Sequence, residues 1–170
     1  MSTAAQVSLE EYLNTSYEPD CDYVDGVLEE RNVGKRRHAR TQTRLALWLG
    51  AREQRYGYQV VVEQRVKVAG TRVRIPDICL LPASDDDEVT QGPPLLCIEV
   101  LSPEDRWSRV DVRLKDYLAF GVPTIWVIDP YANEAWVVTA EAPRTKVEDG
   151  ILRCADPALE VKLSDVLPEE

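Results

Sequence analysis

Two carboxylates stand in segments that are otherwise apolar. Glu99 interrupts the run 95–101, and Asp77 lies at the centre of the apolar stretch that precedes it in the chain. A buried carboxylate is costly unless it meets a cation, a proton or several hydrogen-bond donors. If the two segments pair as a hairpin, the acids meet at one end of a sheet. The residues alone leave two interpretations open, a salt-bridge or capping set and a pair that shares a divalent cation.

The second interpretation points to hydrolysis of a phosphate ester. Magnesium is held by one or two carboxylates, with waters and substrate phosphates completing its shell. We therefore expect Mg²⁺, or Mn²⁺ in its place, at Asp77 and Glu99. Lys115 lies in the segment after Glu99 and could orient a water or stabilise charge that develops on a phosphate. Lys115 also follows Asp111 by four residues, which is the spacing of an ordinary surface pair on a helix.

A basic stripe follows from the helical period of residues 36–56. Apolar residues and His38 fall within one narrow sector, which we assign to the core. His38 is then either a hydrogen-bonded core histidine or a group that faces the acids. Arginines gather on another face of the same segment, at positions Arg37, Arg40, Arg44, Arg52 and Arg55. The segment 35–74 holds eleven Lys or Arg against two acids, although the whole chain has a net charge of −10. This asymmetry favours a surface that meets an anion, with a solvated helix face as the alternative.

The elements that must position these residues can be placed by hydrophobic periodicity and turn signals. We expect a short helix over 8–14, capped by Ser8, and a hairpin over 21–30 around Asp25-Gly26. Strands are expected at 59–68, 72–81, 95–101 and 124–130, a second helix from Ser102 to residue 120, and a final meander of strands between 135 and 154. A strand–helix–strand crossover implies one parallel pair. The fold class is thus α/β, with a mixed sheet flanked by helices.

Length and composition set the remaining bounds. A chain of 170 residues with 44% hydrophobic residues suits one domain over 1–170, with a core over about 22–165. No apolar run is long enough for a bilayer and no secretory signal is visible, so we expect a cytoplasmic protein without membrane contact. Four dispersed cysteines and a single histidine argue against a zinc site of the usual spacing. We expect the cysteines to be reduced thiols.

At the same residues the chain resembles the Uma-two family of restriction-endonuclease-like proteins, within the PD-(D/E)XK nuclease superfamily. The resemblance covers about residues 8–165. It rests on a combination of motifs, namely Tyr23-Val24-Asp25-Gly26 followed by Glu29 or Glu30, then His38, Ile75-Pro76-Asp77, Ile98-Glu99-Val100-Leu101-Ser102-Pro103, Asp111 with Lys115 and Tyr117, and the segment 121–130. Any one of these motifs alone would be weak.

The resemblance implies a restriction-endonuclease-like mixed β-sheet and a metal-dependent endonuclease that hydrolyses phosphodiester bonds in DNA. It implies Asp77 and Glu99 as metal ligands, with Glu30 favoured over Glu29 as the early acid and His38 facing the same cleft. Leu101 stands where the superfamily has its lysine, and the resemblance moves that role to Lys115. Arg37, Arg40 and Arg44 would hold the DNA backbone, and a homodimer would serve to cut both strands. The alternative is an inactive nuclease-like domain that binds nucleic acid or a protein.

Overall fold

The computed structural model describes residues 6–169, which form three sheets and five helices. The largest sheet contains, in spatial order, β10 (Thr145–Lys146), β9 (Glu134–Val138), β8 (Ile125–Asp129), β7 (Leu96–Val100), β6 (Ile78–Pro82) and β3 (Tyr58–Val62). A four-stranded sheet contains β2 (Val27–Glu30), β1 (Cys21–Val24), β5 (Arg72–Arg74) and β4 (Val66–Ala69). The third sheet pairs β11 (Ile151–Cys154) with β12 (Leu159–Lys162). The helices are α1 (Leu9–Leu13), α2 (Arg36–Gly50), α3 (Glu53–Tyr56), α4 (Trp107–Phe120) and α5 (Leu163–Val166).

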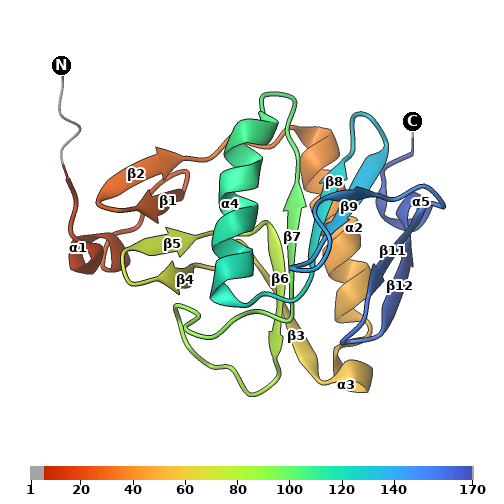
Figure 1. Cartoon of the computed structure of the whole chain (residues 1–170), viewed down its shortest axis with the longest axis horizontal. Helices are drawn as coiled ribbons and strands as arrows, with labels where there is room; N and C mark the ends of the chain where they lie inside the picture. The colour runs from red at the N-terminus through yellow and green to blue at the C-terminus, as the bar shows by residue number, and fades with distance from the viewer. Residues whose placement is uncertain (1–5, 170) are drawn as a thin grey trace.

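The six-stranded sheet lies between two long helices, with α4 on one face and α2 on the other (Figure 1). Strands β7 and β8 are parallel and joined through α4, whereas the other pairs in this sheet are antiparallel. The predicted α/β class and the crossover are therefore confirmed. The meander is confirmed only in part, because β11 does not join the large sheet and pairs instead with β12, a strand that was not predicted from the sequence.

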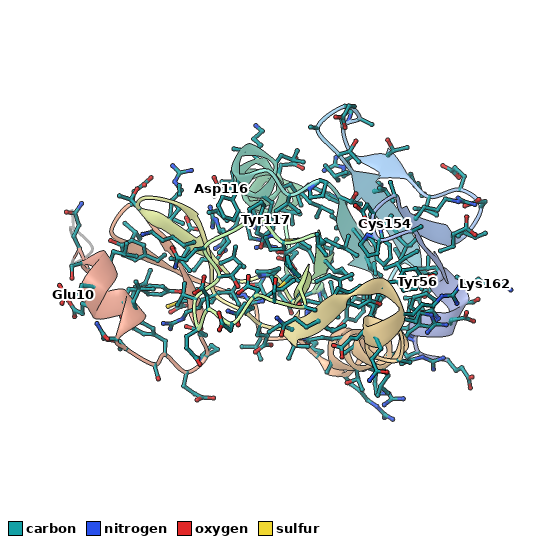
Figure 2. The ribbon with its side chains drawn as sticks, turned by 90° about the horizontal axis from the view of Figure 1, so that it is seen from below. Glu10, Tyr56, Asp116, Tyr117, Cys154 and Lys162 are labelled. Atoms are coloured by element: carbon teal, nitrogen blue, oxygen red, sulfur yellow. The ribbon has the colours of Figure 1, made fainter. Side chains whose placement is uncertain are left out.

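Strand alternation divides the core into two clusters, one on each face of the sheet. In β6, Ile78 and Leu80 face α2, while Cys79 and Leu81 face α4. Leu45 and Leu49 of α2 fill the first cluster, and Val110, Leu114 and Tyr117 of α4 fill the second. Figure 2 shows the side chains that occupy both layers, with Tyr117 on α4. Odd-numbered residues of β7 thus face α4, and Glu99 is one of them.

The N-terminal elements form as predicted. The Ser8 hydroxyl accepts a hydrogen bond of 3.1 Å from the backbone N–H of Glu11, which caps α1. The hairpin of β1 and β2 turns at Asp25 and Gly26, whose φ angles are +50° and +91°. Such angles at both central residues are those of the tight turn that Asp-Gly favours.

Both strands expected at 59–68 and 72–81 are broken in the structure, and each half joins a different sheet. The first breaks at Glu63, whose φ of +51° turns the chain from β3 into β4. The second breaks at 75–77, between β5 and β6, where Pro76 has no N–H to donate to a ladder. At each break the chain passes from one sheet to the other. Asp77 lies in the second of these crossings, 75–77, and is therefore at the junction of the two sheets.

The helix boundaries also differ from the prediction. The helix expected over 36–56 is interrupted after Gly50, so that α3 follows as a separate turn. The second helix begins at Trp107 and not at Ser102. The segment before it is a turn in which the backbone N–H of Ser102 donates to the Asp105 carboxylate at 2.8 Å. The residues Ser102-Pro103-Glu104-Asp105 therefore form a short turn before the helix and not its first turn. Among residues 6–169 no helix is long and apolar enough to cross a membrane.

The four cysteines are free and buried, which makes thiol reactivity a test of the fold. Burial raises the pKa of Cys79 to about 12 and raises that of Cys97 well above its ordinary value. Since the thiolate is the reactive form, we expect neither of these thiols to react with an aromatic disulfide reagent in the native protein at about pH 8. Unfolding in guanidinium should release all four cysteines. Rapid native labelling of Cys79 or Cys97, identified by mass spectrometry, would contradict this packing.

Candidate functional site

The pairing of β6 with β7 brings the two acids together. Ile78 lies opposite Ile98, so Asp77, one residue earlier, faces Glu99, one residue later. Asp77 is 5% exposed and Glu99 is 3% exposed. The meeting expected from the hairpin argument therefore occurs in the structure, at the end of β6 and β7 where the two sheets join.

Asp77 is held by three donors. Its Oδ1 accepts a 3.0 Å hydrogen bond from Arg31 Nη2 and lies 3.4 Å from His38 Nε2, while its Oδ2 accepts from the Val100 backbone N–H at 2.7 Å. Burial acts to raise the pKa of Asp77, but the His38 and Arg31 contacts hold that pKa below its ordinary value. Asp77 is therefore an ionised carboxylate in a closed environment.

Glu99 is held from α4. The Tyr117 hydroxyl donates to its Oε1 at 2.7 Å, and Arg113 Nη2 lies 3.3 Å from its Oε2. Burial is the main cause that raises the pKa of Glu99 to about 7, the Asp77 charge acts in the same direction, and Arg113 opposes both. Across the pair, each of the four carboxylate oxygens thus has a donor or a cation beside it.

The residue that reaches the acids from α4 is Arg113 and not Lys115. Lys115 is exposed, because it lies on the side of the helix away from Val110 and Tyr117. Arg113 stands four residues before Tyr117 and therefore shares its face. The only indication of Arg113 in the sequence was this helical spacing. The expectation for Lys115 came from the type of residue sought, and the structure does not bring that lysine to the pair.

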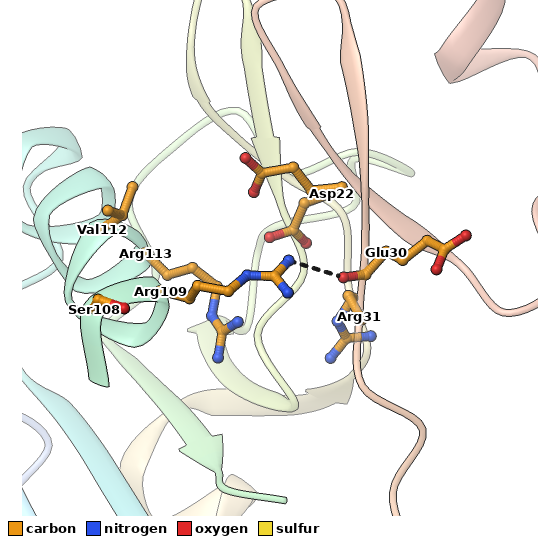
Figure 3. A pocket seen from close by; sticks show the side chains of 8 residues that line it. Asp22, Glu30, Arg31, Ser108, Arg109, Val112 and Arg113 are labelled. Carbon is orange, nitrogen blue, oxygen red and sulfur yellow. Dashed lines mark hydrogen bonds between the residues drawn. The ribbon is translucent and has the colours of Figure 1, made fainter. Parts of the chain in front are cut away.

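The early acids are also placed differently from the expectation. The Glu30 side chain is exposed and points away from the interior, while its backbone carbonyl accepts a hydrogen bond from Arg109 (Figure 3). Glu29 faces inward, but its carboxylate binds Arg74 at 2.8 Å. Neither side chain bonds to Asp77 or Glu99 in the described part of the chain. The hairpin belongs to the four-stranded sheet, and its inward acids, Asp22 and Glu29, are taken up by Arg74.

The His38 imidazole faces Asp77, with Nε2 3.4 Å from Asp77 Oδ1. Burial alone would lower the pKa of His38, but the hydrogen bond and charge of Asp77 raise it above the ordinary value. Gly34 stands directly beside the imidazole, because a Cβ added to Gly34 would lie 2.4 Å from His38 Nδ1. The position of the ring therefore depends on a residue without a side chain.

Substituting Gly34 by alanine should destabilise the fold by about 1–3 kcal/mol, the usual cost of overpacking a filled site. The added methyl would have to move the imidazole away from Asp77. Urea denaturation measures the change, and Gly92→Ala is the control, because a Cβ at Gly92 meets nothing within 4 Å. Equal stability of the two variants would show that the His38 position is not tightly packed.

A cleft of about 430 Å³ opens onto Asp77 and is lined in part by Arg31, Asn32, His38, Gln42 and Glu63. We call it the acid cleft. A second, smaller pocket of about 130 Å³ lies beyond Arg31, which lines both. Figure 3 shows Arg31, Arg109 and Arg113 among the side chains that line this second pocket, which we call the arginine pocket.

The basic stripe of α2 lies away from the acid cleft. Arg37, Arg40 and Arg44 line a separate pocket of about 530 Å³ together with Arg36, Pro168 and Glu169. Arg37 Nε donates to the Pro130 carbonyl at 2.9 Å, and Arg44 Nε donates to the Asp165 carbonyl at 3.2 Å. The stripe and the acid cleft share no lining residue. The structure therefore does not join the arginine stripe to the acids in one cavity.

A family model described as "Uma2: Putative restriction endonuclease" matches residues 9–168. The chain belongs to the Uma2 family. No curated protein matches significantly. Among solved structures, this Uma2 chain is similar to one described as a putative nuclease belonging to DUF820 from Anabaena variabilis ATCC 29413. The TM-score is 0.83 at 19% identity, with 94% of this chain and 97% of that chain covered, which confirms the fold.

Family membership raises the question of whether the Uma2 site suits a divalent cation. Within residues 6–169 no group of three or more His, Cys, Asp or Glu is arranged to hold one. Asp77 and Glu99 nevertheless form the two-carboxylate donor set that magnesium takes when waters and phosphates complete its shell. The charge also fits, because the two carboxylates are now balanced by Arg31 and Arg113, which together carry the charge of one divalent ion. The donor set therefore fits the ion.

Proposed function

We propose that this chain is an endonuclease that hydrolyses phosphodiester bonds in DNA, with Mg²⁺ or Mn²⁺ held by Asp77 and Glu99. Membership of a restriction endonuclease family supports nuclease activity in general. The observation that carries the specific proposal is the pair of neighbouring, buried carboxylates on β6 and β7, of which Asp77 lines the acid cleft. In a protein interior such a pair has to be compensated by positive charge.

The chain's own residues would divide the work around the phosphate. A divalent cation at the pair would supply a Lewis acid for the scissile phosphate and the attacking water. The Val100 N–H and the Tyr117 hydroxyl fix the directions of the two carboxylates. Arg31, at the boundary of both pockets, would bind a phosphate oxygen, and His38 would hold or release a proton beside Asp77.

DNA as the partner is supported by the concentration of positive charge on α2. Arg37, Arg40 and Arg44 would contact phosphates that lie beyond the cleft, since a duplex is wider than one helix of the protein. Such contacts position the duplex without reading its sequence. Cutting both strands would need two sites, so the proposal includes a homodimer, which light scattering of the protein with and without DNA would detect.

A second candidate function is a nuclease-like domain that binds DNA without cutting it. The specific observation in its favour is that all four carboxylate oxygens of the pair already have donors or cations beside them. Buried Leu101 adds to this, since it supplies no amine beside Glu99.

Incubation of supercoiled plasmid with the purified protein separates the two functions. We expect nicked and then linear plasmid in Mg²⁺ or Mn²⁺, and no cleavage in EDTA. A gel shift in Ca²⁺ measures binding independently of cutting. Retained binding without cleavage in any of the metals would favour the second function. Cleavage that persists in EDTA, or in an identically purified Asp77→Asn preparation, would contradict the proposed site.

A further inference from the structure

The carboxylate pair already has internal cations of this chain beside it. Arg31 Nη2 lies 3.0 Å from Asp77 Oδ1, and Arg113 Nη2 lies 3.3 Å from Glu99 Oε2. One arginine comes from the loop after β2 and the other from α4, so they approach from different elements. A divalent cation shared by Asp77 and Glu99 would need the space and the charge that these two guanidinium groups now supply.

The two arginines are held less completely than the acids that they contact. Arg31 donates one hydrogen bond to Asp77, whereas Arg113 Nη2 forms longer ion pairs of 3.3 Å with Glu99 and 3.8 Å with Asp105, and its buried Nε makes no hydrogen bond within the described residues. The Arg31 and Arg113 side chains are 18% and 17% exposed, whereas those of Asp77 and Glu99 are 7% and 4% exposed. The acids are therefore fixed, and the arginines have a way out toward solvent.

The way out leads into the arginine pocket. That pocket of about 130 Å³ is lined by Arg31, Arg109 and Arg113, by Ser108 and Val112, and by the acids Asp22, Glu29 and Glu30. Asp22 and Glu29 are already paired with Arg74, and the Glu30 side chain is exposed. Guanidinium groups bind phosphate oxygens through charge-assisted hydrogen bonds, often two at a time. A phosphate in this pocket would offer Arg31 and Arg113 a partner at the moment when they leave the carboxylates (Figure 3).

We propose that Arg31 and Arg113 act as displaceable internal cations, which keep divalent metal off Asp77 and Glu99 until a nucleic-acid phosphate draws them into the arginine pocket. This inference rests on the proposed function and adds a control on when the site accepts metal. Repulsion between the guanidinium groups and a metal ion, together with competition for the same oxygens, lowers metal affinity in the free protein. By linkage, DNA and metal then each increase the affinity for the other.

The first test measures Mn²⁺ binding without nucleic acid, from the electron paramagnetic resonance signal of the free ion. Arg31→Gln and Arg113→Gln should each bind Mn²⁺ at least about tenfold more tightly than the native protein, because each removes a competing positive charge. Arg31→Lys and Arg113→Lys keep the charge and should stay within about threefold of native. Arg153→Gln, an exposed arginine far along the chain, is the matched control and should not change affinity.

The second test uses the native sequence and so does not depend on the folding of the arginine variants. Fluorescence anisotropy measures the affinity for a short DNA duplex in Ca²⁺ and in NaCl of equal ionic strength. The native protein should bind the duplex at least about fivefold more tightly in Ca²⁺, as coupling free energies of this kind usually produce. Asp77→Asn, which lacks a ligand for the ion, should show no such gain.

The outcomes separate this inference from the proposed function. Tighter Mn²⁺ binding in the glutamine variants and a Ca²⁺-dependent gain in the native protein support the inference. Mn²⁺ binding that depends on Asp77 but is equal in native and glutamine variants overturns the inference and leaves the metal site standing. Absence of Mn²⁺ binding in every variant overturns both.

Discussion

Asp77→Asn should lower plasmid cleavage at least about 100-fold, because losing one of two metal-binding carboxylates removes several kcal/mol of transition-state stabilisation. Asparagine has the same shape, and its amide oxygen can still accept the hydrogen bond that the Val100 N–H donates at 2.7 Å. The fold should therefore survive, with Arg31 free to turn toward solvent through its 18% exposed side chain. Initial rates on supercoiled plasmid measure the effect, and circular dichroism verifies the fold.

The matched control is Asp86→Asn in the exposed acidic loop between β6 and β7, which changes the same charge far from the cleft. Its cleavage rate should equal that of the native protein. If a folded Asp77→Asn protein keeps more than about a tenth of native activity, the essential carboxylate lies elsewhere.

Arg74→Met should produce the largest loss of stability, about 3–5 kcal/mol, the usual cost of breaking a buried ion pair from one side. Arg74 is 1% exposed and bonds three carboxylates, with Nη1 at 3.0 Å from Asp22 and 2.8 Å from Glu29, and Nε at 2.7 Å from Asp116. Methionine fills similar volume but leaves Asp22, which is 2% exposed, without its cation. Urea denaturation measures the loss.

The loss of unfolding free energy caused by Arg74→Met, which we call the deficit, should also depend on pH. Burial raises the pKa of Asp22, while Arg74 is the largest opposing influence, so removing Arg74 raises that pKa further. A folded-state pKa above the unfolded value means that the folded protein binds more protons, so lowering the pH from neutrality toward about 4 should reduce the deficit. Arg72→Met on the same strand is the control. Arg72 is 35% exposed, and its loss should cost at most about 1 kcal/mol. Equal losses for both variants would show that the Arg74 cluster is not a buried network.

The sequence was sufficient to predict that Asp77 and Glu99 lie close together. A carboxylate inside an apolar run indicates a buried strand, and the buried charge requires a cation or hydrogen-bond donors beside it. The sequence was also sufficient for the Asp-Gly hairpin and the crossover through α4, which depend on local turn chemistry and connection handedness. The position of His38 followed from its place on the apolar sector of α2.

The other features of the site and the fold depend on contacts between residues far apart in the chain, which no local sequence pattern indicates. Arg31 lies in a loop, and nothing near it in sequence indicates that its guanidinium reaches Asp77, 46 residues away. The broken strands were not predicted because valine-rich residues continue across the break at Glu63, a residue whose type does not indicate a left-handed backbone. Arg113 is indicated by its spacing of four residues from Tyr117, which places both side chains on one face of α4.

The position of Asp77 at the crossing between sheets gives it a mechanical role as well as a chemical one. Arg31 and the 75–77 crossing are continuous with the four-stranded sheet, whereas Glu99 belongs to the six-stranded sheet. The Val100 N–H and the Gln42 amide, which donates to the Asp77 carbonyl at 3.0 Å, fasten that crossing to the larger body. Asp77 is thus fastened to the six-stranded sheet beside Glu99, so a displacement of the smaller sheet would move Arg31 relative to the two acids without separating the acids from each other.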